Sequence, residues 1–487
     1  MDEVTETSYE KYAKDVFVIG STNALVALSG IILLPLLTKT LGAHDYGIWS
    51  QVQVTIQLVV GIVGLGLPFA IIRFFPVKTS KGEIREEFYS ALCVTFFVTL
   101  IISLAMILAA DFIARVLFED ATDIVRITGL IILVMSLTVL CQSLFRAFRQ
   151  MKKVSVFMLA DTYGQVFVVA ILVMTGYNLL SVILGVLAVR IAIFAVLLFL
   201  IQRQIGVGRP RFSRIREYLS FGLPFVPGGI SSWVVTASDR YVIAYFLGAT
   251  SVGIYSAGYG LGNVLLMIAV VLNLVLPPTL SKLYDEGRLD EVRTHLSYSL
   301  KYLLAIAIPF VFGAALLGEQ VLRMFSTPEI AYEGRYIVPL VAVGCLFWCV
   351  GVMPSSILAL VKRTRVVAIA WGAAAVLNLA LNLLVVPYIG ILGAAITTLV
   401  SYLLALVIRW YYASKEFTFD IGWRFIGKSL TGSVIMSLVV WLIAPEGTLS
   451  TLLAIGAGVA TYGVSIFLLK GFRKEEFEFF KGLFQRG

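Results

Sequence analysis

Charged residues are scarce in this sequence, and so are histidine and cysteine. Only 14% of its 487 residues are charged, against about 25% in ordinary soluble domains, and 59% are hydrophobic. This balance excludes an ordinary soluble enzyme, because the surplus apolar surface must face lipid. The two histidines fall in expected loops, and the four cysteines fall in apolar runs without the spacing of zinc ligands or secreted disulfides: His44, His295, Cys93, Cys141, Cys345 and Cys349. We therefore predict no metal site.

The sequence also lacks a segment long enough to form a soluble domain. The longest polar connection, residues 202–217, leaves no room for an ATPase. Residues 422–429 read GWRFIGKS and match G-x-x-x-x-G-K-[ST], but a phosphate-binding loop needs a preceding strand and a compact loop. Here Trp423 and Phe425 occupy the loop and an apolar run follows, so we predict no nucleotide site. We interpret Lys428 as a side chain that extends to the membrane interface.

What the chain does contain is a series of apolar runs, each long enough to cross a bilayer. About 20 helical residues span the ~30 Å hydrocarbon core. On that measure we predict fourteen membrane-spanning helices, at about 16–37, 47–71, 88–109, 124–145, 154–175, 179–201, 218–246, 253–281, 296–318, 336–360, 366–386, 390–408, 425–444 and 448–469. The fold class predicted is therefore an all-α membrane protein with 14 transmembrane helices.

Basic residues orient this arrangement. Most of the 38 lysines and arginines fall in the two tails and the loops after even-numbered spans, whereas five fall in the loops of the opposite side: Lys39, Arg115, Arg126, Arg323 and Arg335. The positive-inside rule then predicts a multi-pass protein of the cell membrane with both termini in the cytoplasm. The net charge of +9 is thus explained by membrane lipids and not by nucleic acid. Residues 1–15 hold five acidic residues, which is unlike a cleavable signal peptide.

An internal repeat divides the chain. Residues 41–50 read LGAHDYGIWS and residues 247–256 read LGATSVGIYS, with six of ten positions identical. We predict that spans 1–6 repeat as spans 7–12, giving two six-helix lobes related by a pseudo-twofold axis along the membrane normal. The domains predicted are an N-terminal lobe, a basic cytoplasmic linker, a C-terminal lobe, an appendix of two extra C-terminal helices and an amphipathic cytoplasmic tail: 1–201, 202–217, 218–412, 413–470 and 471–487. Duplicated halves are typical of transporters that move one half against the other.

Ionisable residues inside the predicted spans are the first candidate site residues. Such groups are costly in lipid and tend to face a cavity or a partner. They are Arg190, Asp161, Asp239, Arg240 and Lys301. Asp239 and Arg240 are sequence neighbours on different helix faces, so we expect them to have separate partners. Two interpretations stay open for each residue: a structural salt bridge, or a cationic surface for an anionic substrate with a carboxylate that binds a proton or Na⁺.

Polar side chains at helical spacing form the second group of candidates. Ser50, Gln53 and Gln57 line the second span, and the repeat places Ser256, Tyr259 and Asn263 at the same positions of the eighth span. A polar stripe at the same place in both halves indicates the walls of a central cleft. Hydrogen bonding between helices is the alternative explanation.

Four segments carry a family resemblance: the two LGAxxxGI copies, Ser238-Asp239-Arg240, and residues 387–395 (PYIGILGAA). They resemble the polysaccharide biosynthesis (oligosaccharide flippase) family of the multidrug/oligosaccharidyl-lipid/polysaccharide exporter superfamily. The resemblance implies alternating-access transfer of a polyprenyl-diphosphate-linked oligosaccharide between leaflets, with basic groups holding the diphosphate. We expect Arg190, Arg240 and, more weakly, Lys301 to neutralise the substrate, and Gln53, Gln57, Tyr259 and Asn263 to line its path. Asp161 and Asp239 are the candidates for ion coupling.

We predict no catalytic residue and no cofactor beyond coupling to an H⁺ or Na⁺ gradient. The partners expected are the lipid-linked oligosaccharide, membrane lipids and other polysaccharide-assembly proteins. Two alternatives stay open. One is a cation-coupled multidrug or metabolite exporter of the same superfamily. The other is a membrane glycosyltransferase or polymerase, which the absence of a sizeable polar loop disfavours.

Overall fold

All regular secondary structure is helical in the part of the chain that the computed structural model describes, which is residues 2–472 and 476 for the backbone and 18–472 and 476 for the side chains. The predicted amphipathic tail, 471–487, lies outside the described residues except for Gly471, Phe472 and Glu476. The elements of the fold are α1 (Asp2–Val63), α2 (Leu67–Phe74), η1 (Phe75–Val77), α3 (Lys81–Leu108), α4 (Ala110–Leu117), α5 (Thr122–Ala147), α6 (Met151–Met174), α7 (Leu179–Ile205), η2 (Phe212–Arg214), α8 (Ile215–Gly222), α9 (Phe225–Ala237), α10 (Asp239–Gly262), η3 (Asn263–Leu265), α11 (Leu266–Asp285), α12 (Leu289–Phe325), α13 (Pro328–Gly334), α14 (Ile337–Val350), α15 (Val352–Leu360), α16 (Thr364–Ile389), α17 (Ile391–Glu416), α18 (Trp423–Ile443) and α19 (Thr448–Leu468).

Twelve helical segments of the described chain are long and apolar enough to cross a membrane, which confirms a multi-span membrane protein. Two of the twelve, Val18–Val63 and Phe225–Asp285, have 46 and 61 residues and exceed the length of one crossing. Each contains a glycine at which the helix breaks. Gly42 has φ 83° and ψ −179°, and Gly248 has φ 81° and ψ 176°. The two copies of the repeated sequence thus share the same backbone turn, which glycine adopts at little cost.

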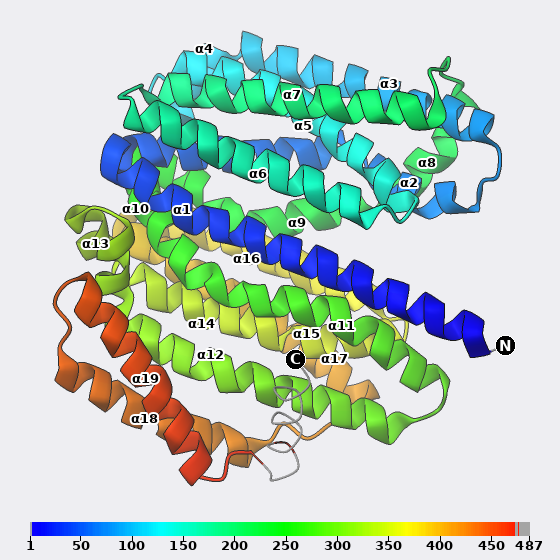
Figure 1. The fold of residues 1–487 in the computed structure, drawn as a ribbon. Helices are drawn as coiled ribbons and strands as arrows, with labels where there is room; N and C mark the ends of the chain where they lie inside the picture. The colour runs from blue at the N-terminus through cyan, green and yellow to red at the C-terminus, as the bar shows by residue number, and fades with distance from the viewer. Residues whose placement is uncertain (1, 473–475, 477–487) are drawn as a thin grey trace. The chain divides into compact units, whose positions relative to one another are not determined.

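The chain separates into two compact units. Unit 1 comprises Met1–Ser256 with Ala374–Ala394, and unit 2 comprises Ala257–Ala373 with Ala395–Gly487. In unit 1, α5 packs against α1, α2, α3, α4 and α7, and α6 covers α1 and α7 (Figure 1). The apolar residues of α5 recur around its whole circumference, so most of the helix is buried inside the unit.

Close contacts between glycines bring two of these elements together. A Cβ atom placed on Gly66, just before α2, would lie 2.1 Å from the carbonyl oxygen of Gly222, the last residue of α8. The backbones therefore touch here, which a larger side chain would prevent.

Unit 2 is built on the long helix α12. This helix contacts α11, α13, α14, α18 and α19, and α18 and α19 pack against each other (Figure 1). Leu317 of α12 packs with Met436 and Val440 of α18 in a small apolar cluster. The two helices that the sequence sets apart as an appendix are thus joined to unit 2 through α12.

Candidate functional site

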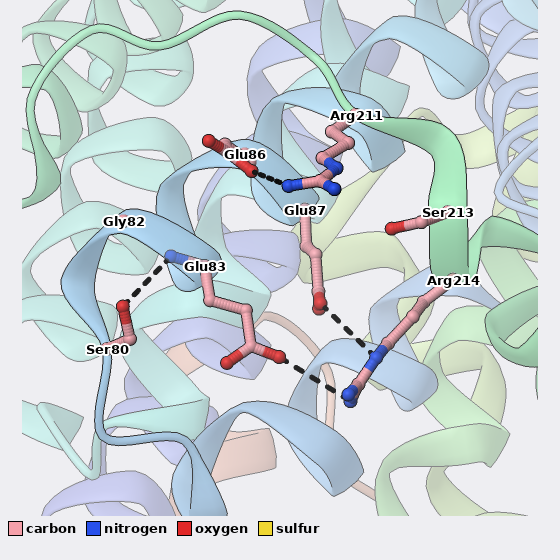
Figure 2. A pocket seen from close by; sticks show the side chains of 8 residues that line it. All are labelled: Ser80, Gly82, Glu83, Glu86, Glu87, Arg211, Ser213 and Arg214. Atoms are coloured by element: carbon pink, nitrogen blue, oxygen red, sulfur yellow. Dashed lines mark hydrogen bonds and ion pairs between the residues drawn. The ribbon is translucent and has the colours of Figure 1, made fainter.

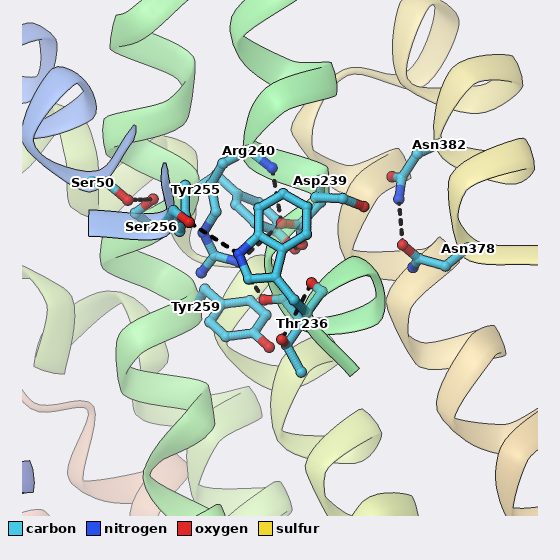
Figure 3. Close-up of polar contacts among 12 residues, drawn as sticks. Ser50, Thr236, Asp239, Arg240, Tyr255, Ser256, Tyr259, Asn378 and Asn382 are labelled. Atoms are coloured by element: carbon cyan, nitrogen blue, oxygen red, sulfur yellow. Dashed lines mark hydrogen bonds and ion pairs between the residues drawn. The ribbon is translucent and has the colours of Figure 1, made fainter. Parts of the chain in front are cut away.

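The two repeated hairpin turns meet each other in unit 1. Ser50 and Ser256 lie 206 residues apart and occupy equivalent positions of the repeat, and their hydroxyl oxygens are 2.7 Å apart (Figure 3). A hydrogen bond thus joins equivalent residues of the two copies at this point. The second helix of α1 and the second helix of α10 therefore cross where the sequence predicts polar residues.

Glycine makes this crossing close. A Cβ atom on Gly47 would lie 1.8 Å from the carbonyl oxygen of Ala249, and one on Gly253 would lie 2.0 Å from the carbonyl oxygen of Ala43. The contact is reciprocal, because Gly47 and Gly253 are again equivalent in the repeat. Small residues at helix crossings allow this backbone approach in membrane proteins.

A buried acid–base pair lies at the junction of α9 and α10. Asp239 Oδ1 is 2.9 Å from Arg240 Nη1, and the two residues are 0% and 7% exposed (Figure 3). The Tyr255 hydroxyl donates a hydrogen bond to Asp239 Oδ2, and the guanidinium of Arg240 lies 5.3 Å from the centre of the Tyr255 ring. Arg240 Nη1 also donates to the carbonyl oxygen of Thr236 (2.7 Å).

This geometry corrects the expectation that Asp239 and Arg240 have separate partners. Asp239 is the first residue of α10, and its carboxylate accepts the backbone N–H of Arg240 (2.9 Å). The carboxylate is held over the helix start in this way, and the long arginine side chain folds back along the helix to reach it. Neighbouring residues can thus pair at a helix terminus although they diverge inside a helix.

Further hydrogen bonds tie α9 and α10 to α1. Trp233 Nε1 donates to the carbonyl oxygen of Val54 (3.0 Å), and the hydroxyls of Thr55 and Tyr241 are 2.7 Å apart. The rings of Trp233 and Tyr241 pack edge to face at 5.4 Å. Polar links of this kind fix the register of helices that lipid alone would not hold together.

A cavity of about 210 Å³ lies beside this frame, between α1 and α9. Its lining combines an amide, an indole and two hydroxyls with small or aliphatic residues: Gln57, Leu58, Gly61, Gly229, Ile230, Ser232, Trp233 and Thr236. Gln57 is one of the predicted site residues, and the half-buried Gln53 precedes it by one helical turn. Thr236 connects the cavity to Arg240 through its carbonyl oxygen. The candidate functional site is therefore this cavity together with the Asp239–Arg240 pair.

Arg190 forms a second buried cationic position of unit 1, on α7. It is 6% exposed, and its Nη2 donates to Gln165 Oε1 on α6 (3.3 Å). Its Nε and Nη1 make no hydrogen bond to any residue that the structure describes. Asp161 lies one turn before Gln165 on α6 and attracts Arg190 electrostatically, but no described carboxylate is within 4.0 Å of the guanidinium. The predicted residues Arg190 and Asp161 thus lie on adjacent helices with Gln165 beside both.

The remaining predicted residues lie in unit 2. Lys301 on α12 is 2.7 Å from Glu476 Oε2, and Tyr302 donates to the same carboxylate (3.2 Å). This ion pair agrees with the interpretation of Lys301 as one partner of a structural salt bridge. Tyr259 lies 3.2 Å from Tyr402, hydroxyl to hydroxyl, and Asn263 Oδ1 accepts a hydrogen bond from Cys345 Sγ (3.5 Å).

Arg409 is a buried cation that the sequence analysis does not single out. The predicted twelfth span ends at residue 408, but α17 continues to Glu416 and leaves Arg409 only 3% exposed. The sequence does contain a signal for a longer helix. Residues 410–413 (WYYA) include no helix breaker, so the helix can continue past Arg409.

A larger cavity, of about 440 Å³, lies where the basic linker meets α3 (Figure 2). Its lining combines three glutamates of α3 with two arginines of the linker and with serine and glycine: Ser80, Gly82, Glu83, Glu86, Glu87, Arg211, Ser213 and Arg214. Lys78 lies 2.7 Å from both Glu83 and Glu87, and Arg214 lies 3.5 Å from Glu83. Burial and the Glu87 carboxylate raise the pKa of Tyr218, which donates a hydrogen bond to Glu87. The charged side chains that line this cavity pair with one another. These ion pairs hold the linker against α3.

Glu119, in the turn between α4 and α5, joins the two hairpin turns. Its Oε1 accepts the backbone N–H of Ala249 (2.6 Å) and its Oε2 lies 2.8 Å from His44 Nε2. The Ala249 N–H, followed by His44, holds the pKa of Glu119 below its ordinary value.

This lowered pKa predicts a small pH dependence of stability. A carboxylate with a depressed folded-state pKa stabilises above its unfolded pKa of about 4.3, and that contribution is lost as the pH falls through the folded value. Because the side chain is 44% exposed, we expect an effect of at most ~1 kcal/mol. Melting temperatures of wild type and Glu119→Gln in detergent should converge as the pH falls from 6 to 3; a constant difference would contradict this role.

Among the described residues, no group of three or more His, Cys, Asp or Glu is placed to hold a metal ion. The arrangement of buried cations, a buried carboxylate and a cavity of mixed polar and apolar lining within a set of membrane-spanning helices is typical of a membrane transporter. Comparison with known proteins agrees with this class. The family model described as "Polysaccharide biosynthesis protein" matches residues 12–284, more than half of the chain, and the MatE model matches residues 224–384. The chain therefore belongs to the polysaccharide biosynthesis protein family, as its sequence motifs predict.

Individual relatives are distant. "Probable flippase AglR" of Haloferax volcanii is 25% identical over 253 residues, 50% of this chain and 52% of that protein. "Probable low-salt glycan biosynthesis flippase Agl15" of the same organism is 21% identical over 274 residues, 55% of this chain and 58% of that protein. The alignments thus span little more than half the length of these curated relatives. The solved structure "Lipid II flippase MurJ, inward closed conformation" has a TM-score of 0.76 at 17% identity, over 93% of this chain and 99% of that one, and shows the same fold.

Proposed function

We propose that this protein is a flippase that moves a polyprenyl-diphosphate-linked oligosaccharide across the cell membrane for the assembly of surface polysaccharide or glycoconjugate. The observation that carries the proposal is the buried Arg240, which donates to the carbonyl oxygen of Thr236, a residue that lines the cavity between α1 and α9. A guanidinium binds phosphate oxygens bidentately, and a buried one binds them without competition from water. The relatives named as flippases support the same class of substrate.

The proposed topology has fourteen crossings. The breaks at Gly42 and Gly248 divide the two overlong segments, so that each contributes two spans where a straight helix would contribute one. An even number of crossings puts both termini on one side, which the distribution of basic residues makes the cytoplasm. The two six-helix lobes are kept in this topology, and alternating access would proceed by their relative motion.

The site residues have separate roles in this proposal. Arg240 and Arg190 neutralise the diphosphate, with Lys301 a weaker candidate, while Gln53, Gln57, Tyr259 and Asn263 contact the sugars. When a phosphate takes Arg240, the buried Asp239 loses its charge partner and gains stability by binding H⁺ or Na⁺. Asp161 attracts Arg190 from the adjacent helix without a direct ion pair, and we propose it as the second candidate for cation coupling. Cation binding and substrate binding would be coupled in this way without any covalent chemistry.

Removing the cations tests the proposal. We expect Arg240→Ala and Arg190→Ala to lower flipping of a lipid-linked oligosaccharide in reconstituted vesicles by about tenfold or more, because each loses charge-assisted hydrogen bonds to phosphate worth roughly 1.5–3 kcal/mol. Arg203→Ala, at an exposed position of α7, is the matched control and should transport normally. Wild-type rates for both buried-site variants, at equal amounts of folded protein, would remove these residues from the site.

The match of the MatE model to residues 224–384 favours a second candidate, a cation-coupled multidrug exporter. Drug-sensitised cells that express this protein would then become resistant to organic cations. The flippase proposal predicts unchanged sensitivity in those cells.

A further inference from the structure

Trp233 of α9 is held in one orientation beside the cavity between α1 and α9. Its indole Nε1 donates to the carbonyl oxygen of Val54 on α1 (3.0 Å), and its ring packs edge to face on Tyr241 at 5.4 Å. The Tyr241 hydroxyl is fixed in turn, because it lies 2.7 Å from the hydroxyl of Thr55. Trp233 is nevertheless only half-buried, and it lines the cavity. A ligand that contacts this indole meets a surface that is already ordered, which lowers the entropic cost of binding.

The cavity is small and open to the molecular surface. Gln57 of α1 and Gly229 and Ile230 of α9 line it and are exposed, so a ligand reaches it without displacing these helices. Its volume of about 210 Å³ lies below the ~300–1,000 Å³ of pockets that enclose drug-sized ligands. The space therefore fits one small ring and not a chain of several sugars.

Two glycines keep this space free. Gly61 and Gly229 line the cavity from its two helices, and a Cβ atom on either would meet no atom within 4 Å outside the local helix backbone. A larger side chain at either position thus extends into open space without overpacking a neighbour. Gly228 has the same freedom, but it does not line the cavity.

The lining has the chemistry of a neutral amphipathic ligand. None of the residues that line the cavity is charged, so the lining offers no partner for a phosphate. The exposed Gln57 amide both donates and accepts, and the Thr236 hydroxyl, which donates to the carbonyl oxygen of Ser232 (3.0 Å), keeps lone pairs for a ligand. A pyranose ring presents C–H groups on its faces and hydroxyls around its edge, which match an indole with polar groups beside it. An alkyl chain would desolvate these polar groups and leave them without hydrogen bonds.

We propose that Trp233 is the stacking surface of a monosaccharide-binding subsite in this cavity, an inference that rests on the proposed function and names the position of one sugar within it. The sugar ring lies on the indole, and Gln57 and Thr236 bind its hydroxyls. Thr236 also accepts a hydrogen bond from Arg240 through its carbonyl oxygen (2.7 Å), so the sugar in this subsite is the one attached to the diphosphate. Gly61 and Gly229 limit the size of the sugar that fits.

The contribution of the sugar to affinity tests this subsite. Purified full-length protein in a polyoxyethylene detergent, which has no sugar headgroup, binds a fluorescent polyprenyl-diphosphate oligosaccharide. The competitors are polyprenyl diphosphate without a sugar and the same lipid carrying one glucose, galactose or N-acetylglucosamine. The readout is the ratio of the dissociation constant of the sugar-free lipid to that of the tightest sugar-bearing lipid. We expect this ratio to be about tenfold or more for wild-type protein.

Variants of the indole should change this ratio and not the binding of the sugar-free lipid. We expect Trp233→Leu to lower the ratio about 2- to 12-fold, the effect of losing one aromatic contact, and Trp233→Phe to lower it less because a ring remains. Trp441→Leu removes a tryptophan of α18 that is 68% exposed, and it should keep the wild-type ratio.

Filling the cavity is an independent test that leaves the Trp233 hydrogen bond in place. Gly229→Leu places an aliphatic side chain in the space of the sugar, and we expect the ratio to fall to about one while the sugar-free lipid binds as before. Gly228→Leu is the matched control, because it makes the same change one residue away in the same helix. It should bind like wild type.

The outcomes distinguish this inference from the proposed function. If Trp233→Leu lowers the melting temperature and neither it nor Gly229→Leu changes the ratio, Trp233 only ties α9 to α1 and the inference is wrong. If Gly229→Leu weakens binding of the sugar-free lipid as much as that of the sugar-bearing ones, the cavity holds another part of the lipid, which also overturns the inference. A wild-type protein that flips its substrate but has a ratio of one for every sugar overturns this inference alone. A wild-type protein that neither flips nor binds any of these lipids overturns the proposed function itself.

Discussion

Alanine in place of Gly47 or Gly253 is expected to abolish most translocation. The added methyl group would lie 1.8 or 2.0 Å from a carbonyl oxygen of the opposite hairpin, so the two turns must separate. Overpacking of this kind costs ~1–3 kcal/mol. If this free-energy cost falls only on the conformation in which the two hairpins touch, the population of that conformation falls by a factor of about 5–150. Flipping rates of each variant in vesicles measure the effect.

Two control variants test whether the effect is specific to the crossing of the hairpins. A methyl group added at Gly30 in α1 or at Gly260 in α10 would have no atom within 4 Å, so Gly30→Ala and Gly260→Ala should transport like wild type. Cross-linking reports the contact directly, because Ser50→Cys with Ser256→Cys places two thiols at positions whose hydroxyls are 2.7 Å apart. We expect Gly253→Ala to lower the cross-linking yield in that background. Normal transport and normal yield together would show that the crossing has no part in the cycle.

The buried pair of Asp239 and Arg240 gives the second large effect. Asp239→Ala removes the carboxylate from a guanidinium that is 7% exposed, and breaking a buried pair costs about 3–5 kcal/mol. We expect this variant to lose both stability and flipping. Combining Asp239→Ala with Arg240→Met removes both charges, and the stability should then return to within roughly 1 kcal/mol of wild type.

The double variant separates the structural role of the pair from its functional role. Stability that recovers while flipping stays lost places the charges in transport. Tyr255→Phe is the mild variant of the series, since it deletes one hydroxyl that donates to Asp239 and leaves both charges in place. We expect it to cost roughly 1.5–3 kcal/mol and to slow flipping less than Asp239→Ala. A double variant that flips at the wild-type rate would show that the pair only stabilises the fold.

The membrane class and the helical breaks can be predicted from the sequence because both depend on local composition. Apolar runs of about 20 residues indicate spans wherever they occur. The repeated LGAxxxGI segments predict equivalent turns, and Gly42 and Gly248 have the same backbone conformation. The repeat also aligns Ser50 with Ser256, the two residues whose hydroxyls meet in the fold.

Partners distant in sequence cannot be predicted in the same way. Lys301 pairs with Glu476, which lies 175 residues further on, and no local pattern connects them. Hydropathy falls after residue 408 and so predicts a loop at Arg409, whereas tertiary packing keeps the helix and buries the side chain. The pairing of Asp239 with Arg240 depends on the helix boundary at Ser238, which the apolar run conceals.

The most direct test of the proposed function is translocation by the purified protein in sealed vesicles. A fluorescent polyprenyl-diphosphate oligosaccharide is placed in both leaflets, and the fraction that an impermeant reductant or lectin reaches is followed with time. The proposed function predicts that wild-type protein makes nearly all of the lipid accessible, that empty vesicles plateau near half, and that vesicles with Arg240→Ala approach the wild-type plateau about tenfold more slowly or slower still. Equal plateaus with and without the wild-type protein, under an imposed H⁺ or Na⁺ gradient as well as without one, would contradict it.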